Sequence, residues 1–217
     1  NAQARPNLVR INWVGLATIV RKETRRVVRI WIQTIVPPAI TMTLYFIIFG
    51  RLVGSRIGQM DGHAYTTFIA PGLIMMAVIT NSFANGFSSF FSSKLMLHLE
   101  EMLVAPLAHA TIVVGFVAGG IVRGLLVAAL VVVVAMFFTD LHVVHPLITA
   151  TTIVLTAVVL SLAGLFNAIF ARSFDDISII PTFVLTPLTY FGGVFFSISL
   201  LPPFWQGVAR INPILYT

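Results

Sequence analysis

The sequence contains no cysteine and little charge, and both shortages restrict what the protein can be. Without cysteine it forms neither disulfides nor thiolate metal sites. Charged residues make up only 9% of its 217 residues, whereas 58% are hydrophobic. A soluble domain of this length could not hide so much apolar surface in one core. The composition therefore indicates a protein with several membrane spans.

Five apolar stretches are long enough to cross a bilayer, which takes roughly 20 residues. None of them alternates polar and apolar residues as a barrel strand does, so each is predicted to be a helix. The predicted fold is a single all-α polytopic membrane domain covering residues 1–217. The predicted spans are residues 30–50, 65–87, 112–138, 147–170 and 177–196.

The net charge of +6 is distributed unevenly along the chain. Seven of the thirteen Lys and Arg residues precede the first predicted span: Arg5, Arg10, Arg21, Lys22, Arg25, Arg26 and Arg29. By the positive-inside rule, the N-terminus is predicted to be cytoplasmic. This orientation explains the basic residues without a nucleic-acid partner. No A-x-A-like site follows the first span, so a cleaved signal peptide is not expected.

The segment before the first span, residues 1–29, is predicted to contain an amphipathic helix. One face carries Ala17, Val20, Thr24, Val27, Val28 and Trp31, and the opposite face carries Lys22, Arg25, Arg26 and Arg29. Such a helix is expected to lie flat on the inner leaflet. This helix serves either as an ordinary membrane anchor, held at the inner leaflet by its positive charge, or as a lever beside a partner protein.

Proline and glycine mark irregular or closely packed helices. Pro37 and Pro38 in the first span, and Pro181 and Pro187 in the fifth, predict kinks or local breaks. The third span contains two GxxxG spacings, built from Gly115, Gly119, Gly120 and Gly124. These predict close helix contact, either within the subunit or across a dimer.

The last residues, 197–217, combine prolines with Phe204, Trp205 and Tyr216. This composition predicts a short interfacial or re-entrant element on the outer face. Five spans from a cytoplasmic N-terminus leave this end outside, so a sixth span is expected beyond it. The missing initiator Met likewise suggests a trimmed N-terminus.

The sequence offers little chemistry of its own. Neither Lys22 nor Lys94 follows the Gly-rich stretch of a P-loop, so ATP hydrolysis by this chain is not expected. Ion-coupled carriers place a carboxylate within the membrane, and no Asp or Glu lies deep in a predicted span. Asp175 and Asp176 stand where the fifth span begins, where they could cap backbone N–H groups, form a gate or contact Arg172.

Arg123 is the one basic residue well inside an apolar stretch. It could bind a substrate anion, or it could extend to the inner interface or to the carbonyl groups of a neighbouring helix. A loop further along the chain holds three conceivable metal ligands, Asp140, His142 and His145, but their spacing matches no firm motif. A solvated loop is favoured, and no metal site is predicted.

The segment Lys94–Pro106, KLMLHLEEMLVAP, is polar and helix-prone between two apolar stretches. As one helix it would carry a stripe of Leu95, Leu99 and Met102 beside a stripe of Lys94, His98 and Glu101. It is predicted to dock against a cytoplasmic partner. The pair Glu100 and Glu101 resembles the paired glutamates of some intramembrane proteases, but the basic residue and His-rich span of those enzymes are missing.

The chain resembles the permease subunits of bacterial ABC-2 type transporters, most closely the YadH-like members. Five segments carry the likeness: RIWIQTIVPPAITMTLYFIIFG (Arg29–Gly50), FIAPGLIMMAVITNSFAN (Phe68–Asn85), LEEMLVAP (Leu99–Pro106), FDDISIIPTFVLTPLTYFGGVFFS (Phe174–Ser197) and LPPFWQ (Leu201–Gln206). Together they cover most of the chain.

The resemblance implies six spans and a homodimer around a central pathway, with two copies of a cytoplasmic ATPase that grip the loop between spans two and three. ATP and Mg²⁺ would be bound by that ATPase, and this chain would hold no cofactor or catalytic residue. Leu99, Glu100, Glu101 and Pro106 match the pattern of the gripped loop. The stripe of Leu95, Leu99 and Met102 is expected to enter a groove of the ATPase, with Glu100 or Glu101 paired to a basic residue there.

The expected function is ATP-driven export of an amphipathic, lipid-like or glycan-linked molecule or a drug across the bacterial inner membrane. Arg123, Asp175 and Asp176 are candidates for a gate or pathway. The alternatives are an ATP-independent channel or membrane-assembly protein, and a secondary transporter.

Overall fold

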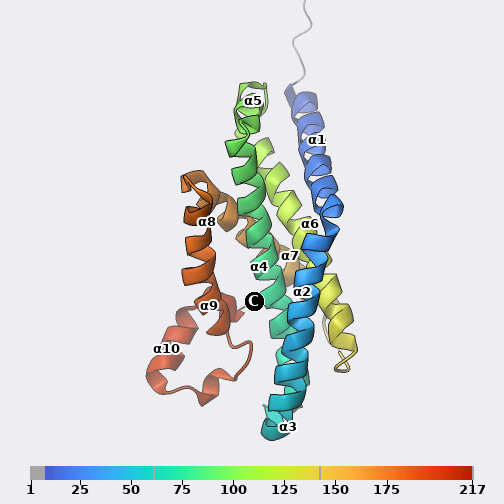
Figure 1. The fold of residues 1–217 in the computed structure, drawn as a ribbon, viewed down its shortest axis with the longest axis vertical. Coiled ribbons are helices and arrows are strands. Elements are labelled where there is room, and N and C mark those ends of the chain that lie inside the picture. The colour runs from blue at the N-terminus through green and yellow to red at the C-terminus, as the bar shows by residue number, and fades with distance from the viewer. Residues whose placement is uncertain (1–7, 61, 142, 217) are drawn as a thin grey trace, which may run out of the picture.

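A computed structural model describes residues 8–60, 62–141 and 143–216. They form an elongated helical bundle with one small hairpin (Figure 1). The long helices are α1 (Leu8–Arg29), α2 (Trp31–Tyr45), α4 (Tyr65–Leu95), α6 (His109–Met136) and α7 (Pro146–Phe170). The shorter helices are α3 (Gly54–Ile57), α5 (His98–Val104), α8 (Phe174–Ile180), α9 (Thr186–Tyr190) and α10 (Pro203–Ile211). Two π-helical segments, η1 (Phe46–Val53) and η2 (Pro181–Leu185), two 3₁₀ turns, η3 (Ile198–Leu200) and η4 (Pro213–Tyr216), and the strands β1 (Gln59–Met60) and β2 (His63–Ala64) complete the described part.

Four helical runs are long and apolar enough to cross a membrane: Trp31–Ile57, Tyr65–Leu95, His109–Met136 and Pro146–Phe170. They correspond to the first four predicted spans. The second run continues well past its predicted end at residue 87. Its last turns stay helical because Phe90, Phe91 and Ser93 are buried against the bundle.

The fifth predicted span consists of three consecutive short segments, α8, η2 and α9. Its helix ends at Tyr190, earlier than predicted, because the chain turns at Gly192 and Gly193, and Gly193 has φ +79°. The predicted irregularity at Pro181 is confirmed, since the π-helical η2 begins there. This run is not among the four helical runs long enough to span, so a fifth crossing stays a prediction.

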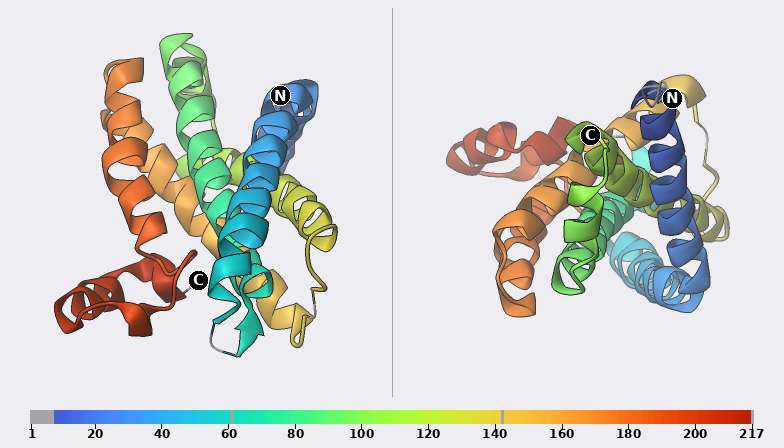
Figure 2. Two further views of the ribbon diagram at one scale, coloured as in Figure 1. Left: turned by 60° about the horizontal axis from the view of Figure 1, so that its bottom comes forward. Right: turned by 90° about the horizontal axis from the view of Figure 1, so that it is seen from above.

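The first span differs from expectation in where it bends. Pro37 and Pro38 lie inside the uninterrupted helix α2, and the irregular backbone lies one turn or more away, at Ile30 and in η1. Each proline removes the hydrogen bond to the carbonyl four residues earlier, which here belongs to the first turn of α2. The chain changes direction between α1 and α2. In the view from above, α1 is therefore seen from the side and α2 nearly end-on (Figure 2).

Helix α4 lies at the centre of the bundle and packs most extensively against α7 and α6. The α4–α7 crossing is made at glycines. A side chain at Gly86 would collide with the backbone of Ser161, and one at Gly164 would collide with the backbone of Phe83. Neither helix could approach the other so closely with a larger residue at these positions.

The four glycines of α6 face two sets of neighbouring helices. Gly115 and Gly119 lie against Ile19 and Glu23 of α1. Gly120 and Gly124 lie against Ser82 of α4 and against α7. The close contact predicted from the GxxxG spacings is therefore confirmed, and it is made within one subunit.

The hairpin, α3 and α10 lie at the lower end of the molecule in Figure 1, opposite α5 and the start of α1. The hydroxyl of Tyr65 at the start of α4 donates a buried hydrogen bond of 2.7 Å to the carbonyl of Phe195. This bond ties the segment after α9 to the bundle. Residues 198–216 form η3, α10 and η4, with Phe204 and Trp205 exposed, and Thr217 lies outside the described residues. Their interfacial or re-entrant role stays a prediction.

The close α4–α7 crossing predicts that Gly86→Ala destabilises the protein, because the added methyl group would push against the backbone of Ser161. Overpacking of this kind costs about 1–3 kcal/mol. The matched control is Gly207→Ala on α10, where an added methyl group meets nothing within 4 Å. We expect thermal melts in detergent to show a lower Tm for the first variant and an equal or higher Tm for the second. Equal effects would contradict the proposed tight crossing.

Candidate functional site

The segment expected to form one helix from Lys94 to Pro106 is divided in two. Helix α4 continues to Leu95, and α5 begins at His98 after Leu97 adopts φ +61°. Positive φ is uncommon for a residue other than glycine, and it reverses the direction of the chain here. Leu95 therefore does not share a helical face with Leu99.

The apolar surface at this turn also differs from the predicted stripe. Leu99 and Met102 pack against the protein's own core, beside Ile112 and Phe116. The exposed apolar side chains are those of Leu95, Met96, Leu97, Leu103 and Val104. Glu100, Glu101 and Pro106 are exposed beside them. We call the eight exposed residues the α5 surface.

Lys94, expected on the polar stripe of the same helix, instead caps another helix. Its Nζ donates to the carbonyl oxygens of Ile169 at 2.8 Å and Ala171 at 2.9 Å, at the end of α7. The last carbonyl groups of a helix have no partner within it, and a cation there also interacts favourably with the helix dipole. Lys94 thus fastens the end of α4 to the end of α7.

The two aspartates near the start of α8 form a helix cap. The carboxylate of Asp176 accepts hydrogen bonds from the backbone N–H groups of Arg172 at 3.0 Å and Ser173 at 3.1 Å, and the Ser173 hydroxyl accepts one from the N–H of Asp176. This reciprocal arrangement is a capping box. The capping hypothesis is therefore confirmed for Asp176, and no ion pair joins either aspartate to Arg172 among the described residues.

A cluster that the sequence analysis did not predict joins three helices. We call it the polar junction, and it consists of Glu23 and Arg26 of α1, Asn85 and Ser89 of α4, and Arg123 of α6. Glu23 is fully buried, and its Oε2 accepts from Ser89 Oγ at 2.5 Å and from Arg26 Nε at 3.3 Å. Arg26 Nη2 donates to Asn85 Oδ1 at 2.8 Å. Within the part of the chain that the structure describes, Glu23 and Arg26 form the single ion pair.

Arg123 lies near enough to Arg26 for the two positive charges to repel each other, and α6 approaches α1 and α4 closely one turn earlier. A Cβ atom at Gly119 would lie 2.8 Å from the Cβ of Glu23 and 3.2 Å from Nδ2 of Asn85. Arg123 stands one turn after Gly119, and helical side chains lean back over the preceding turn. Its buried Nε has no partner among the described residues. The hypothesis that Arg123 satisfies the carbonyl groups of a neighbouring helix is therefore not supported.

Glu23 was missed because basic residues surround it in the sequence. The apolar face predicted to lie on the inner leaflet included Val27 but neither Ile19 nor Glu23, whereas the stripe that packs on the bundle is Ile19, Glu23 and Val27, at four-residue spacing. The four-residue spacing of Ile19, Glu23 and Val27 was the sequence pattern that could have identified this face. A carboxylate between two apolar residues on one face is costly to bury unless it has partners.

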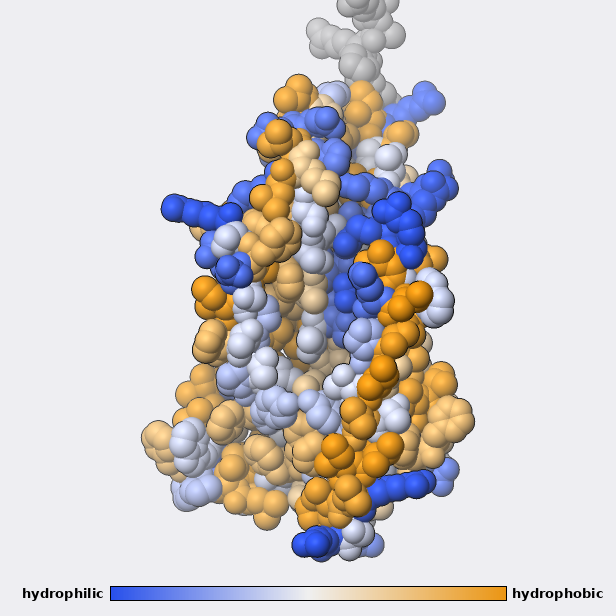
Figure 3. Space-filling view, in the orientation of Figure 1, coloured by the Kyte–Doolittle hydropathy of each residue, from blue (hydrophilic) through white to orange (hydrophobic). Residues whose placement is uncertain are grey.

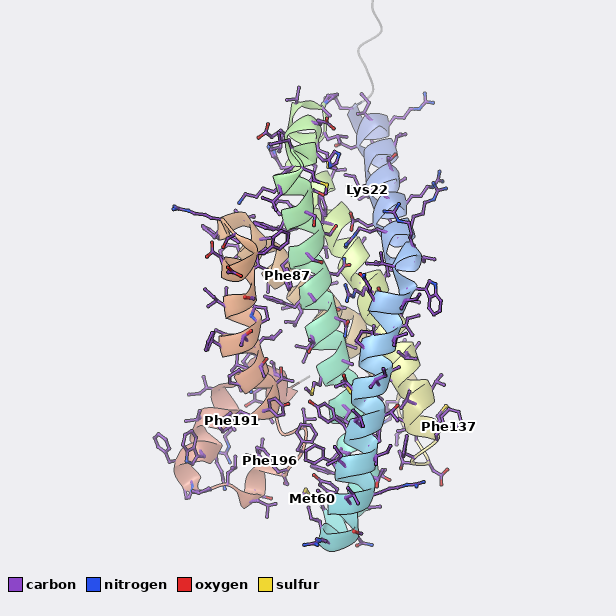
Figure 4. The ribbon with its side chains drawn as sticks, in the orientation of Figure 1. Lys22, Met60, Phe87, Phe137, Phe191 and Phe196 are labelled. Carbon is purple, nitrogen blue, oxygen red and sulfur yellow. The ribbon has the colours of Figure 1, made fainter. Side chains whose placement is uncertain are left out.

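A cleft of about 370 Å³ lies between α4 and the run from η2 to α9. Phe87, one of its lining residues, projects into the gap between α4 and α8 in Figure 4. Four threonines line it together with aromatic and aliphatic side chains: Thr80, Thr182, Thr186 and Thr189. The hydroxyl groups of Thr80, Thr186 and Thr189 donate to backbone carbonyls one turn earlier. The cleft therefore offers a mixed, mainly apolar surface with few hydrogen-bonding groups.

Two tyrosines meet at the lower end of this cleft. The hydroxyl groups of Tyr45 in α2 and Tyr190 in α9 lie 3.1 Å apart. Both rings also contact Phe195, with centroid distances of 5.6 Å and 5.7 Å. Both tyrosines are among the residues that line the cleft. The sequence analysis did not predict this pair, since 145 residues separate its members.

The surface divides along the long axis. On the face shown in Figure 3, hydrophilic side chains gather at the upper end around α1, and most of the lower part is hydrophobic. The conceivable ligands Asp140 and His145 lie near the lower end, and His142 lies outside the described residues. No group of metal-ligating side chains occurs in residues 8–60, 62–141 and 143–216.

Comparison with known proteins identifies relatives for nearly the whole chain. The family model described as ABC-2 type transporter matches residues 15–217. The chain is 58% identical to inner membrane transport permease YadH of Escherichia coli K12 over 209 residues, which cover 96% of this chain and 82% of that protein. It is 26% identical to nodulation protein J of Rhizobium leguminosarum bv. viciae over 80% of this chain and 68% of that protein. No solved structure matches.

The capping box at α8 predicts a pH-dependent contribution to stability. The backbone N–H of Arg172, with additional bonds from Ser173, holds the pKa of the Asp176 carboxyl below its ordinary value. A lowered pKa in the folded state means that the carboxylate stabilises the fold above its ordinary pKa, and that this contribution is lost as the pH falls through the folded-state value. We expect Asp176→Asn to lower Tm at pH 7, with a deficit that shrinks on acidification.

The control for this titration is Asp140→Asn, which removes an exposed carboxylate outside any helix. Thermal melts between pH 7 and pH 3 should show little effect of this substitution. A deficit of Asp176→Asn that stayed constant across the range would exclude a contribution from the charged form.

Proposed function

This chain belongs to the ABC-2 type transporter family, and on that premise we propose that it is the membrane-spanning permease subunit of an ATP-driven exporter. The observation that carries the proposal is the extent of the family match, which includes every helix that could span a membrane. The chain supplies the path through the membrane. A separate cytoplasmic ATPase, in two copies on a homodimer of this chain, binds ATP and Mg²⁺ and performs the hydrolysis.

The α5 surface is the proposed contact with the ATPase. It places five exposed apolar side chains beside two exposed carboxylates, Glu100 and Glu101. Burial of such apolar groups favours association, and the carboxylates pair with basic residues of the partner. Leu99 and Met102, which were expected to enter the ATPase, instead hold α5 against the core of this chain. Movement of α5 is therefore transmitted directly to α4 and α6.

The orientation of the chain follows from its charge. Described basic residues at the α1 and α5 end include Arg21, Lys22, Arg25, Arg29 and Lys94, and this end is proposed to face the cytoplasm. The end carrying α3 and α10 faces outward. A relative is named an inner membrane transport permease, which supports the same location for this chain.

The cleft between α4 and α9 is proposed as part of the pathway. Its mainly apolar lining, with four threonines, suits an amphipathic, lipid-like or glycan-linked molecule or a drug better than a small ion. The tyrosine pair closes its outer end. Lipid covers the remaining apolar faces of α2 and α7.

The test of the proposal is a pulldown of the full-length protein in mild detergent from its native host, with the partners identified and counted. We expect an ATPase at a ratio of two to two. Glu100→Ala with Glu101→Ala should reduce the amount retained, because the partner's basic residues lose their counter-charges. The control is Asp140→Ala at the opposite end. Reproducible recovery without a nucleotide-binding partner would favour an ATP-independent channel or assembly protein.

The proposed closure by Tyr45 and Tyr190 predicts that Tyr190→Phe opens the cleft more readily from outside. Because the chain has no cysteine, a single Thr80→Cys can report access to a membrane-impermeant maleimide added outside. We expect severalfold faster labelling in the Tyr190→Phe background, since the hydroxyl contact is lost. Ser199→Cys, near the outer end, serves as the control. Unchanged labelling at position 80 would show that the pair does not control access.

A further inference from the structure

We propose that the polar junction is a binding site for an anionic headgroup of the phosphate or carboxylate type, held by Arg123 and Arg26. The proposal goes beyond the permease function and depends on it only for placing this end of the bundle at the cytoplasmic leaflet. The ligand approaches from the surface between α1 and α4.

The first argument is the charge of the junction. It contains two guanidinium groups and one carboxylate. Glu23 is already engaged with Arg26 and Ser89. Arg123 therefore has no counter-ion within the described residues, and an unpaired cation this far along an apolar helix is costly. An anion from outside the chain would remove that cost.

The second argument is the balance of hydrogen-bonding atoms. Two buried donors of the junction lack a partner among the described residues: Arg123 Nε and Asn85 Nδ2. One buried acceptor, Glu23 Oε1, is also without a partner. Donors thus exceed acceptors. A group with several acceptor oxygens matches this excess, and guanidinium groups bind such oxyanions in pairs.

The third argument is access. The side chain of Arg26 is 24% exposed, and Arg123 is also partly exposed, so neither residue is sealed inside the bundle. Hydrophilic side chains gather in this region on the face shown in Figure 3. Glu23 is fully buried behind them. A headgroup can therefore reach the two arginines without meeting the carboxylate first.

Two sources could provide this anion, and they share the same chemistry. It can be the headgroup of an anionic membrane lipid, which is abundant at the cytoplasmic leaflet. It can also be a water-soluble phosphate compound or a charged group on the transported molecule. Binding to a short-chain lipid and to a phosphate without acyl chains separates these sources.

The experiment measures ligand binding to the purified full-length protein by native mass spectrometry. The probes are dihexanoyl phosphatidylglycerol, dihexanoyl phosphatidylcholine and inorganic phosphate. We expect phosphatidylglycerol to bind more tightly than phosphatidylcholine, and Arg123→Gln to weaken that binding by about tenfold or more. Arg56→Gln on α3 removes an equal charge at the other end and should leave binding unchanged. Arg123-dependent binding of inorganic phosphate would assign the site to soluble anions as well as lipids.

A second variant keeps the proposal testable if Arg123→Gln fails to fold. Glu23→Gln retains a group that can accept from Ser89 but removes the competing negative charge, so it should bind phosphatidylglycerol more tightly than the wild type. Equal binding of the two lipids by the wild type, or no change in either junction variant, would overturn the proposal. Since the assay uses neither ATP nor transport, that result would leave the permease function standing.

Discussion

The close approach of helix backbones at glycine is the constraint on which the rest of this structure depends. Between helices in lipid, apolar burial gives little driving force, because the lipid tails are as apolar as the side chains. Dispersion contacts must then hold the bundle, and they need short interhelical distances. Gly86 and Gly164 provide them between α4 and α7, and the glycines of α6 provide them toward α1, α4 and α7. The contacts of Glu23 with its partners lie at one of these close approaches, beside Gly119.

The polar junction illustrates this dependence. Glu23 lies where Gly119 leaves room for it, and a side chain on α6 at that position would displace the carboxylate. The same gap lets Arg123 extend toward α1 and α4. Removal of one partner of a buried ion pair leaves a charge without compensation and destabilises the folded protein by about 3–5 kcal/mol. The position of α1 on the bundle is therefore set jointly by glycine packing and by the partners of Glu23.

The sequence alone predicted the features that depend on local composition. Four of the five spans predicted from hydropathy correspond to helices long enough to cross a membrane, the glycine spacing identified the close face of α6, and the aspartates at residues 175–176 indicated a helix cap. The features it missed depend on one backbone turn or on distant partners. Leu97 adopts a left-handed conformation between α4 and α5, and Leu99 and Met102 of α5 face the core of this chain. Glu23 meets Ser89, and Tyr45 meets Tyr190, only after the bundle has assembled.

Helix α4 connects the three regions for which a role is proposed, and this suggests how movement passes between them. Its last turn is fastened to α7 by Lys94 and leads into α5, its middle carries Asn85 and Ser89 of the polar junction, and its other face lines the cleft. A helix transmits displacement along its axis because its hydrogen bonds are internal. Displacement of α5 by a partner would therefore alter the cleft and the junction together. For such coupling the two conformations must differ in contact energy, and the Glu23 carboxylate, with one oxygen unpartnered among the described residues, provides a contact that can change.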